Sequence, residues 1–210
     1  MVRLVVAPGV VLWRGWLTPA GQAALLADVM ARLDQAPLYR PVMPGSGKAF
    51  SVEESNFGPL GWVSDRTGYR YQATHPATGQ PWPDLPSSLS ALWADIASQF
   101  LPDPPPPSCC LVNLYRGTAR LGLHQDRDEG DTSAPVVGVS LGDEALFRIG
   151  GTSRKGATRS VRLVSGDVVA FGGTARLAFH GIDRVQAGTS ALVPGGGRLS
   201  LTLRHVRREP

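Results

Sequence analysis

The sequence contains only two cysteines, Cys109 and Cys110, and they are neighbours in the chain. Adjacent cysteines rarely bridge, and two of them cannot form a disulfide framework. A small protein stabilised by disulfides is therefore excluded. We expect Cys110 to be a small buried residue of a strand, and a reducing cytoplasm to be the compartment of the protein.

Long hydrophobic runs are also missing. The apolar stretch over 1–11 contains Pro8 and Gly9 and is too short to span a membrane, and it lacks a signal-peptide pattern. We therefore expect no membrane anchor. Charged residues make up 18% of the chain and hydrophobic residues 42%, a balance that excludes a disordered protein.

The 210 residues suit one compact unit with a substantial core, and the chain has no internal repeat. We expect a monomer. The formal net charge of +4 favours polyanionic partners, because neutralised phosphates release their counterions.

The first half of the chain predicts two helices. Residues 4–12 read as a strand or strand pair broken at Pro8 and Gly9, and Thr18 can then cap a helix with Pro19 in its first turn. A second helix begins near Pro86, and we expect both helices to pack outside one sheet. Their apolar stripes are Leu25, Leu26, Val29, Met30 and Leu33, then Leu89, Leu92, Trp93, Ile96 and Phe100.

From Cys109 onward, short β-rich runs alternate with glycine-containing turns. Eight short antiparallel strands suggest a mainly β fold with flanking helices (α+β), built as a double-sheet jelly roll with a mouth at one end. The expected strands cover 109–115, 120–126, 135–141, 145–149, 160–164, 167–171, 176–180 and 198–205.

Three residues can form a metal site. His124 and Asp126 are two apart, so on a strand both point to one face, and His180 ends another β-rich run. Two imidazoles and one carboxylate make the facial triad that binds Fe(II) and leaves coordination positions open. Taken singly, a surface histidine beside a solvated aspartate, or a structural histidine, explains each residue as well.

The stretch from Arg198 to Arg204 alternates strictly between polar residues and leucines. Arg198, Ser200, Thr202 and Arg204 share one face, and an arginine can clamp a carboxylate of a diacid such as 2-oxoglutarate. Asn113 and Tyr115 also share one face and can supply an amide and a phenol to the same cosubstrate. The alternatives are an outward polar face on an edge strand for the arginines, and packing or turn roles for Asn113 and Tyr115.

Aromatic residues gather in the glycine-bounded stretch over 60–71. Trp62, Tyr69 and Tyr71 can stack on an extruded base, or form the half-buried core of a small hairpin. Asp128 lies near the metal if its strand continues past Asp126. If the strand stops, Asp128 is a solvated loop acid like its neighbours Glu129 and Asp131.

Taken together, these motifs resemble the AlkB family of alkylation-repair dioxygenases. The similarity rests on Leu-Gly-Leu-His-Gln-Asp-Arg-Asp-Glu at 121–129 and on the segments 134–142, 166–173, 176–182 and 198–204. Upstream, 60–62, 68–69 and 81–83 also match. The resemblance runs from about Val11 to Arg204.

The resemblance implies a double-stranded β-helix with an N-terminal nucleotide-recognition lid. The expected division is an N-terminal extension over 1–108, with the lid at about 41–84, and a catalytic jelly-roll core over 109–210, together one compact unit. The resemblance implies that His124, Asp126 and His180 hold iron, and that 2-oxoglutarate is bound by Asn113, Leu114, Tyr115, Arg198, Ser200 and Arg204. Trp62 would stack on the damaged base, with Tyr69, Arg70 and Tyr71 on the nucleic-acid backbone and Asp128 and Arg154 on the substrate.

The implied activity is oxidative dealkylation of 1-methyladenine and 3-methylcytosine in single- or double-stranded DNA, with RNA as a second polymer, in the repair of DNA damage. It consumes Fe(II)-activated O2 and 2-oxoglutarate and releases formaldehyde, succinate and CO2. The positive charge of these bases suits the carboxylate of Asp128, and Arg207 and Arg208 would help to hold phosphates.

Two features depart from the family pattern: Ser200 stands where the closest relatives carry asparagine, and the segment over 43–50 is poorly matched. Two other classes compete with this interpretation. A 2-oxoglutarate-dependent hydroxylase of a protein or small molecule would not need Trp62, and a non-catalytic β-sandwich that binds nucleic acid would tolerate loss of the metal ligands.

Overall fold

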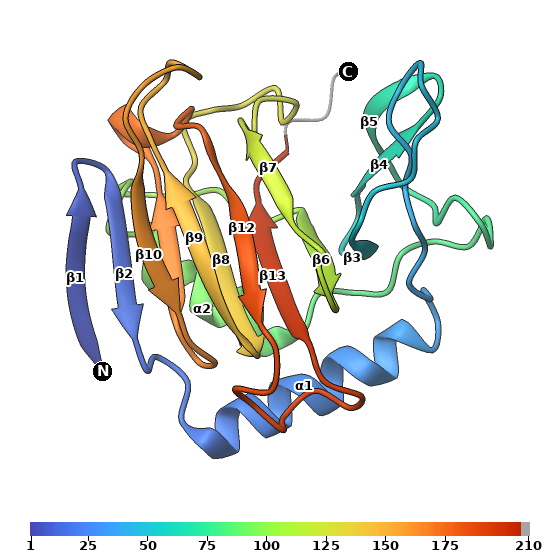
Figure 1. Ribbon diagram of the computed structural model, residues 1–210, viewed down its shortest axis with the longest axis horizontal. Helices are drawn as coiled ribbons and strands as arrows, with labels where there is room; N and C mark the ends of the chain where they lie inside the picture. Colours follow the sequence, from blue (N-terminus) through green and yellow to red (C-terminus); the bar gives the residue numbers. More distant parts are fainter. Residues whose placement is uncertain (207–210) are drawn as a thin grey trace.

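The computed structural model describes residues 1–206 of the chain, and its strands form three antiparallel sheets (Figure 1). Two of these sheets face each other across an apolar layer, so the expected jelly roll is confirmed. The seven-stranded sheet runs β1 (Val2–Ala7), β2 (Val10–Arg14), β11 (Val168–Phe171), β8 (Val136–Gly142), β13 (Arg198–Arg204), β6 (Cys109–Tyr115) and β3 (Glu53–Phe57).

The other two sheets are smaller. The four-stranded sheet runs β10 (Arg159–Leu163), β9 (Glu144–Ile149), β12 (His180–Gln186) and β7 (Leu121–His124). A hairpin of β4 (Gly61–Asp65) and β5 (Gly68–Gln72) lies beside β3, at the opposite end of the molecule from β1 (Figure 1).

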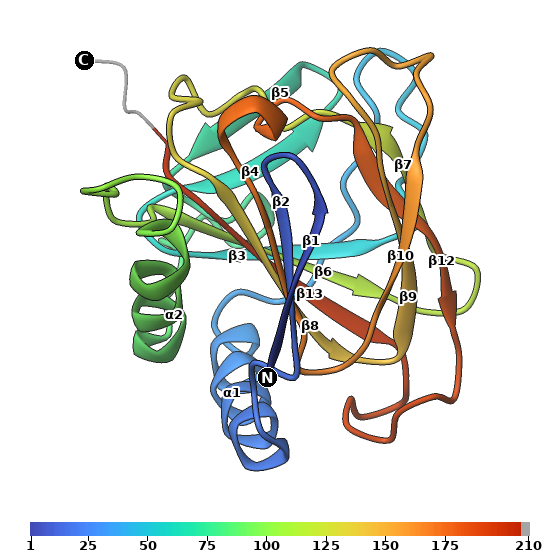
Figure 2. The ribbon, with the colours of Figure 1, turned by 90° about the vertical axis from the view of Figure 1, so that its left-hand side faces the viewer.

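Two helices cover the outer face of the seven-stranded sheet, as expected (Figure 2). In α1 (Pro19–Leu33), the Thr18 side chain accepts a hydrogen bond from the backbone of Gly21 at the N-terminus, which satisfies an otherwise unpaired N–H group. Met30, expected in the apolar stripe, is 39% exposed. In α2 (Ser87–Ala97), the residues Leu89, Leu92, Trp93 and Ile96 are buried as predicted, and Phe100 lies beyond the helix end.

The alternation of β13 separates the two faces of the large sheet. Leu199, Leu201 and Leu203 pack with the helices in one core, because successive side chains of a strand point to opposite faces. A second core lies between the two facing sheets and includes Tyr115 and Phe147. Cys109 and Cys110 are both buried and unbridged, as expected.

The sequence pattern placed one strand wrongly. The predicted strand over 176–180 is instead a turn that follows a short 3-10 helix, η1 (Gly173–Ala175), and β12 begins only at His180. The backbone N–H groups of Ala175, Arg176 and Ala178 bond to carbonyls three residues earlier, so they cannot join a ladder.

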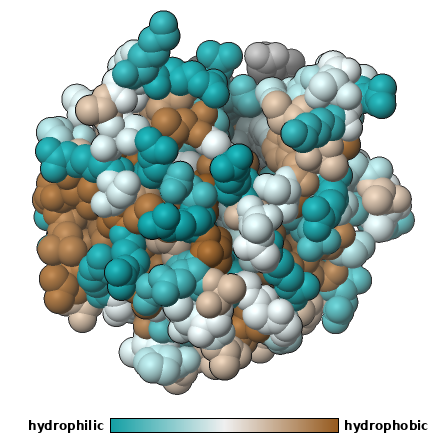
Figure 3. Space-filling view, viewed as in Figure 1, coloured by the Kyte–Doolittle hydropathy of each residue, from teal (hydrophilic) through white to brown (hydrophobic). Residues whose placement is uncertain are grey.

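The segment before Cys109 contributes both edges of the large sheet. At one edge, β1 and β2 confirm the predicted strand pair broken at Pro8 and Gly9, and at the other edge β3 pairs with β6. Met1, Val2, Leu4 and Val5 of the outermost strand region are exposed, and an apolar patch covers that edge (Figure 3). Among the described residues, no helix has the length and apolar character that crossing a membrane requires.

Candidate active site

A cavity of about 1100 Å³ opens between the two facing sheets and beside the β4–β5 hairpin. The fold brings most of the sequence-predicted site residues to it. Lining side chains include Trp62, Tyr69, Asn113, Tyr115, His124, Asp126, Asp128, Arg154, His180, Arg198, Ser200 and Arg204.

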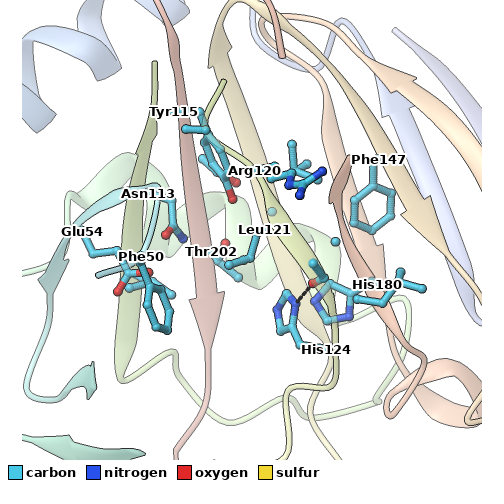
Figure 4. Close-up of a pocket in the computed structure, with 18 of the residues that line it drawn as sticks. Phe50, Glu54, Asn113, Tyr115, Arg120, Leu121, His124, Phe147, His180 and Thr202 are labelled. Atoms are coloured by element: carbon cyan, nitrogen blue, oxygen red, sulfur yellow. Dashed lines mark hydrogen bonds between the residues drawn. The ribbon is translucent and has the colours of Figure 1, made fainter. Parts of the chain in front are cut away.

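Two histidines face each other across neighbouring strands of the small sheet. His124 on β7 is the register partner of His180 on β12, and their ring centroids are 4.4 Å apart (Figure 4). The Nδ1 atoms lie 2.9 Å from the carbonyl oxygen of Gly122 and 3.0 Å from that of Ala178, respectively. With Nδ1–H donating there, each Nε2 lone pair is left for a ligand.

Asp126 completes the cluster from outside any strand. Strand β7 ends at His124, so the shared strand face predicted for the pair is wrong, yet Asp126 Oδ1 lies 3.5 Å from His124 Nε2 and 3.8 Å from His180 Nε2. One ligand atom from each of the three residues lies within 4.8 Å of the others. Two imidazole nitrogens and one carboxylate oxygen are the donor set of a facial triad, so the residues fit Fe(II).

The protonation states favour metal binding. Burial raises the pKa of Asp126, but the charge of Arg204 and the two histidines outweigh it and hold that pKa well below its usual range. Burial and the neighbouring His124 lower the pKa of His180 to about 4, so this imidazole is neutral. Burial acts to lower the pKa of His124, yet the Asp126 carboxylate raises it overall, and the same negative charge attracts a metal cation in place of that proton.

A buried network of charges holds Asp126 in place. Arg204 Nε and Nη2 lie 2.8 and 2.7 Å from Asp126 Oδ2. Glu129, 2% exposed, accepts hydrogen bonds from Tyr71 Oη at 2.8 Å and Arg176 Nη2 at 3.2 Å, and Arg176 Nη1 also donates to the backbone oxygen of Asp126 at 2.6 Å. The expectation that Glu129 is a solvated loop acid is therefore wrong.

Arg198 lies at the other end of β13, and two of its three side-chain nitrogens lack partners. It is 2% exposed, and Nη2 donates to Ser140 Oγ at 3.0 Å, while Nε and Nη1 have no hydrogen-bond partner among the described residues. Its Cζ lies 5.5 Å from the centroid of the Tyr115 ring. A buried guanidinium with unpaired N–H groups requires an anion, so the site fits a carboxylate of 2-oxoglutarate.

The polar residues between these two ends come from neighbouring strands. Asn113 on β6 is paired with Ser200 on β13, and both line the cavity. Leu114 does not reach the cavity, because the alternation of β6 turns its side chain into the helix-side core.

The hairpin places aromatic rings at the cavity mouth. Trp62 and Tyr69 are stacked, with ring centroids 5.4 Å apart and planes inclined by 21°. Trp62 Nε1 donates to Asp128 Oδ2 at 3.4 Å. Asp128 is an exposed loop residue, as expected if the strand stops, but it still lines the cavity.

The remaining predicted substrate contacts lie in different places. Arg70 Nη2 forms an exposed ion pair with Asp65 Oδ2 at 2.8 Å, and Tyr71 points into the Glu129 network rather than to the cavity surface. Arg154 is exposed on the loop after β9, with its Cζ 5.9 Å from the centroid of the Phe179 ring. Arg207 and Arg208 lie outside the described residues.

Sequence reasoning missed several buried polar residues of this site, among them Glu54, Ser140 and Arg176. The role of each depends on partners distant in the chain, and Glu54 lies among other polar residues of β3 that give it no distinguishing pattern. A polar residue inside the apolar run of β8, such as Ser140, is the one local signal that was available.

Comparisons with known proteins agree with this geometry. The sequence profile of the 2OG-Fe(II) oxygenase superfamily matches residues 9–204. The alpha-ketoglutarate-dependent dioxygenase AlkB homolog of Caulobacter vibrioides is 54% identical, covering 97% of this chain and 90% of that protein. AlkB of Escherichia coli is 38% identical over 97% and 93% of the two chains. The solved structure of OsALKBH1 is 31% identical and superimposes with a TM-score of 0.79, covering 97% and 100%.

Proposed function

Because the chain belongs to the AlkB family of Fe(II)- and 2-oxoglutarate-dependent dioxygenases, we propose that it oxidatively removes alkyl groups from nucleobases in nucleic acid. The observation that carries this proposal is the convergence in one cavity of a metal triad, an unpaired buried arginine and a stacked aromatic pair. A resident metal, a diacid cosubstrate and a planar substrate each find matching groups there.

His124, Asp126 and His180 would hold the iron. When bound, iron and 2-oxoglutarate activate O2 for oxidation of the alkyl carbon, which leaves a methylated base as formaldehyde while 2-oxoglutarate becomes succinate and CO2. Arg204 occupies Asp126 Oδ2, so it turns Oδ1 toward the histidine nitrogens. The protein therefore fixes the orientation of its own metal ligand before metal arrives.

Arg198 would bind the distal carboxylate of 2-oxoglutarate. Its Nε and Nη1, which lack partners, leave N–H donors for carboxylate oxygens, and Ser140 and the Tyr115 ring hold the guanidinium in place. Asn113, Ser200 and Arg204 line the cavity between Arg198 and the triad, where they would contact the rest of the diacid.

The hairpin would bind the damaged base. A base extruded from the stack needs an aromatic surface, which Trp62 and Tyr69 present, and a hydrogen-bond acceptor, which Asp128 supplies. A negative carboxylate favours 1-methyladenine and 3-methylcytosine, since both carry positive charge. We infer that the segment 41–84, with this hairpin, acts as the nucleotide-recognition lid, and that exposed Arg70 and Arg154 contact phosphates.

The proposal is tested with Fe(II), 2-oxoglutarate and single-stranded DNA carrying 1-methyladenine or 3-methylcytosine, and with a parallel RNA set. Mass spectrometry measures loss of the methyl group, and succinate is measured beside it. We expect His124→Ala to lose repair by at least about a thousandfold, because one of three metal ligands is gone. His205→Ala, outside the cavity, is the matched control and should keep full activity.

Succinate formation without repair of any lesion would contradict the proposal. It would favour the alternative, a 2-oxoglutarate-dependent hydroxylase that acts on a protein or small molecule. Unchanged repair by His124→Ala would contradict the metal site itself.

A further inference from the structure

A buried acid lies in the cavity but takes no part in the chemistry described so far. Glu54 on β3 is 1% exposed and lines the same cavity as the triad. Its Oε2 has no hydrogen-bond partner among the described residues, and neither its own strand nor β6 supplies a cation. Such a group needs an explanation, because an unpaired buried carboxyl group is costly.

Asn113 is the direct neighbour of Glu54 on the cavity face. The two residues are register partners in the antiparallel pair of β3 and β6, so their Cβ atoms are about 5 Å apart. Asn113 is 3% exposed, and its Oδ1 also lacks a partner. In Figure 4 the Asn113 oxygen lies on the side of Glu54 and the nitrogen on the side of Thr202.

A single proton on Glu54 would satisfy both unpaired oxygens, because the carboxylic acid can then donate a hydrogen bond to Asn113 Oδ1. Burial raises the pKa of Glu54 to about 8, and the positive charge of Arg204, which opposes this, does not overcome it. At neutral pH Glu54 is therefore a carboxylic acid with one O–H donor. Cys109 and Cys110 pack elsewhere, and Tyr115, which shares the cavity face of β6, donates no hydrogen bond to Asn113 Oδ1.

We propose that Glu54 is a positioning residue for 2-oxoglutarate: its O–H donates to Asn113 Oδ1 and thereby turns the Asn113 N–H2 group toward the cosubstrate. The proposal rests on the proposed function, in which Asn113 contacts the diacid. The opposite orientation would pair the amide N–H2 with Glu54 and present Oδ1 to a carboxylate, which repels it. A donor at position 54 therefore selects the orientation that binds an anion.

Direct binding tests this without turnover. Calorimetry measures the Kd of 2-oxoglutarate for protein loaded with Mn(II), with no nucleic acid present. We expect Glu54→Met, which fills similar volume without a donor, to raise the Kd about tenfold, the loss of one positioning hydrogen bond. Glu54→Gln keeps an N–H donor and should stay within about twofold of wild type. Glu53→Met, on the opposite face of β3 beside Arg40, is the matched control and should change nothing.

A double-mutant cycle separates positioning from general damage to the fold. In an Asn113→Ala background the amide is absent, so Glu54→Met should have no further effect on the Kd. An equal tenfold loss in that background would overturn the proposal, as would Glu54→Gln binding as weakly as Glu54→Met.

A second measurement tests the role of Glu54 even if Glu54→Met fails to fold. Raising the pH from 7 to 9 removes the proton of Glu54 in wild type but changes nothing at position 54 in Glu54→Gln. The charged and titratable groups that act on it are Arg204 on β13, Tyr115 on β6 and Tyr39, whose backbone pairs with Glu54, and both proteins share them. We expect the Kd of wild type to rise several-fold more than that of Glu54→Gln; parallel pH profiles would refute the role.

The outcome is independent of repair. If wild type binds 2-oxoglutarate but repairs no lesion, the proposed substrate class fails while the role of Glu54 stands. If lesions are repaired and the Glu54 variants all bind 2-oxoglutarate like wild type, the positioning role alone fails.

Discussion

Around Asp126 the buried polar groups are paired with one another, whereas around Arg198, at the other end of β13, several have no partner. At the first end Arg204, Arg176 and Tyr71 satisfy the carboxylates of Asp126 and Glu129. At the second, unpaired atoms remain on Arg198, Asn113 and Glu54. The end around Asp126 is therefore organised by the protein alone, whereas the end around Arg198 keeps unpaired atoms that a ligand can satisfy.

Removing one residue of the paired network around Asp126 should have the largest effect on the free energy of unfolding. Glu129→Leu would leave the buried guanidiniums of Arg176 and Arg204 without that carboxylate, so we expect a loss of about 3–5 kcal/mol in the free energy of unfolding. Urea denaturation of metal-free protein measures it. Asp128→Leu, an exposed acid next in the chain, should change stability by less than about 0.5 kcal/mol. Similar stabilities for the two variants would show that the paired network around Asp126 does not stabilise the fold.

A substitution at the Arg198 end should change stability in the opposite direction. Arg198→Met removes a buried charge that has no ion pair among the described residues and one hydrogen bond, to Ser140, so stability should hold or rise, while the Kd of 2-oxoglutarate rises at least about a hundredfold. Calorimetry and urea denaturation of the same preparations measure both. Arg162→Met, an exposed arginine on β10, is the control. A marked loss of stability in Arg198→Met would show that this guanidinium is already paired.

A smaller effect concerns pH. The pKa of Glu54 rises from 4.5 in the unfolded chain to about 8 in the fold. Between these values the unfolded state binds fewer protons, so this group makes stability fall as pH rises. Between pH 5 and 7, wild type should lose about 2 kcal/mol more than Glu54→Gln in urea denaturation of metal-free protein. Equal slopes for the two proteins would place the Glu54 pKa near its ordinary value.

The smallest expected effect is on the affinity for 2-oxoglutarate, and it concerns Ser200 near the Arg198 end of the cavity. Ser200 lies between Asn113 and Ser140 across three neighbouring strands. Ser200→Asn adds an amide donor among unpaired groups, so we expect the Kd of 2-oxoglutarate to fall about two- to fivefold. Thr202→Asn, two residues along the same face, tests whether position 200 matters. Weaker binding by Ser200→Asn would indicate that the serine already makes the useful contact.

The sequence predicted those site residues whose side-chain direction follows from the alternation along a strand. The alternation over 198–204 correctly placed Arg198, Ser200 and Arg204 on one face and the leucines on the other, because side-chain direction in a strand has a period of two. The same rule was sufficient for Asn113, but it turns Leu114 away from the cavity.

What the sequence could not predict depends on contacts between distant segments. Asp126 is held beyond the end of β7 by Arg204 and Arg176, and Glu129 is buried only because those arginines reach it. No local pattern distinguishes Glu129 from a solvated loop acid. Strand β12 was misplaced for the same reason, since its polar residues enter the sheet through pairing with β7 and β9.

Arg198 and Arg204 are the first and last residues of one strand that is hydrogen-bonded to β6 on one side and β8 on the other. Six steps of about 3.3 Å separate their Cα atoms by about 20 Å. A strand tied on both sides cannot stretch or contract without breaking its ladder, so the span between the two cationic anchors is fixed. The strand therefore holds the guanidinium that positions Asp126 and the guanidinium that has unpaired N–H groups at one constant separation, so binding at one end cannot draw the other end closer.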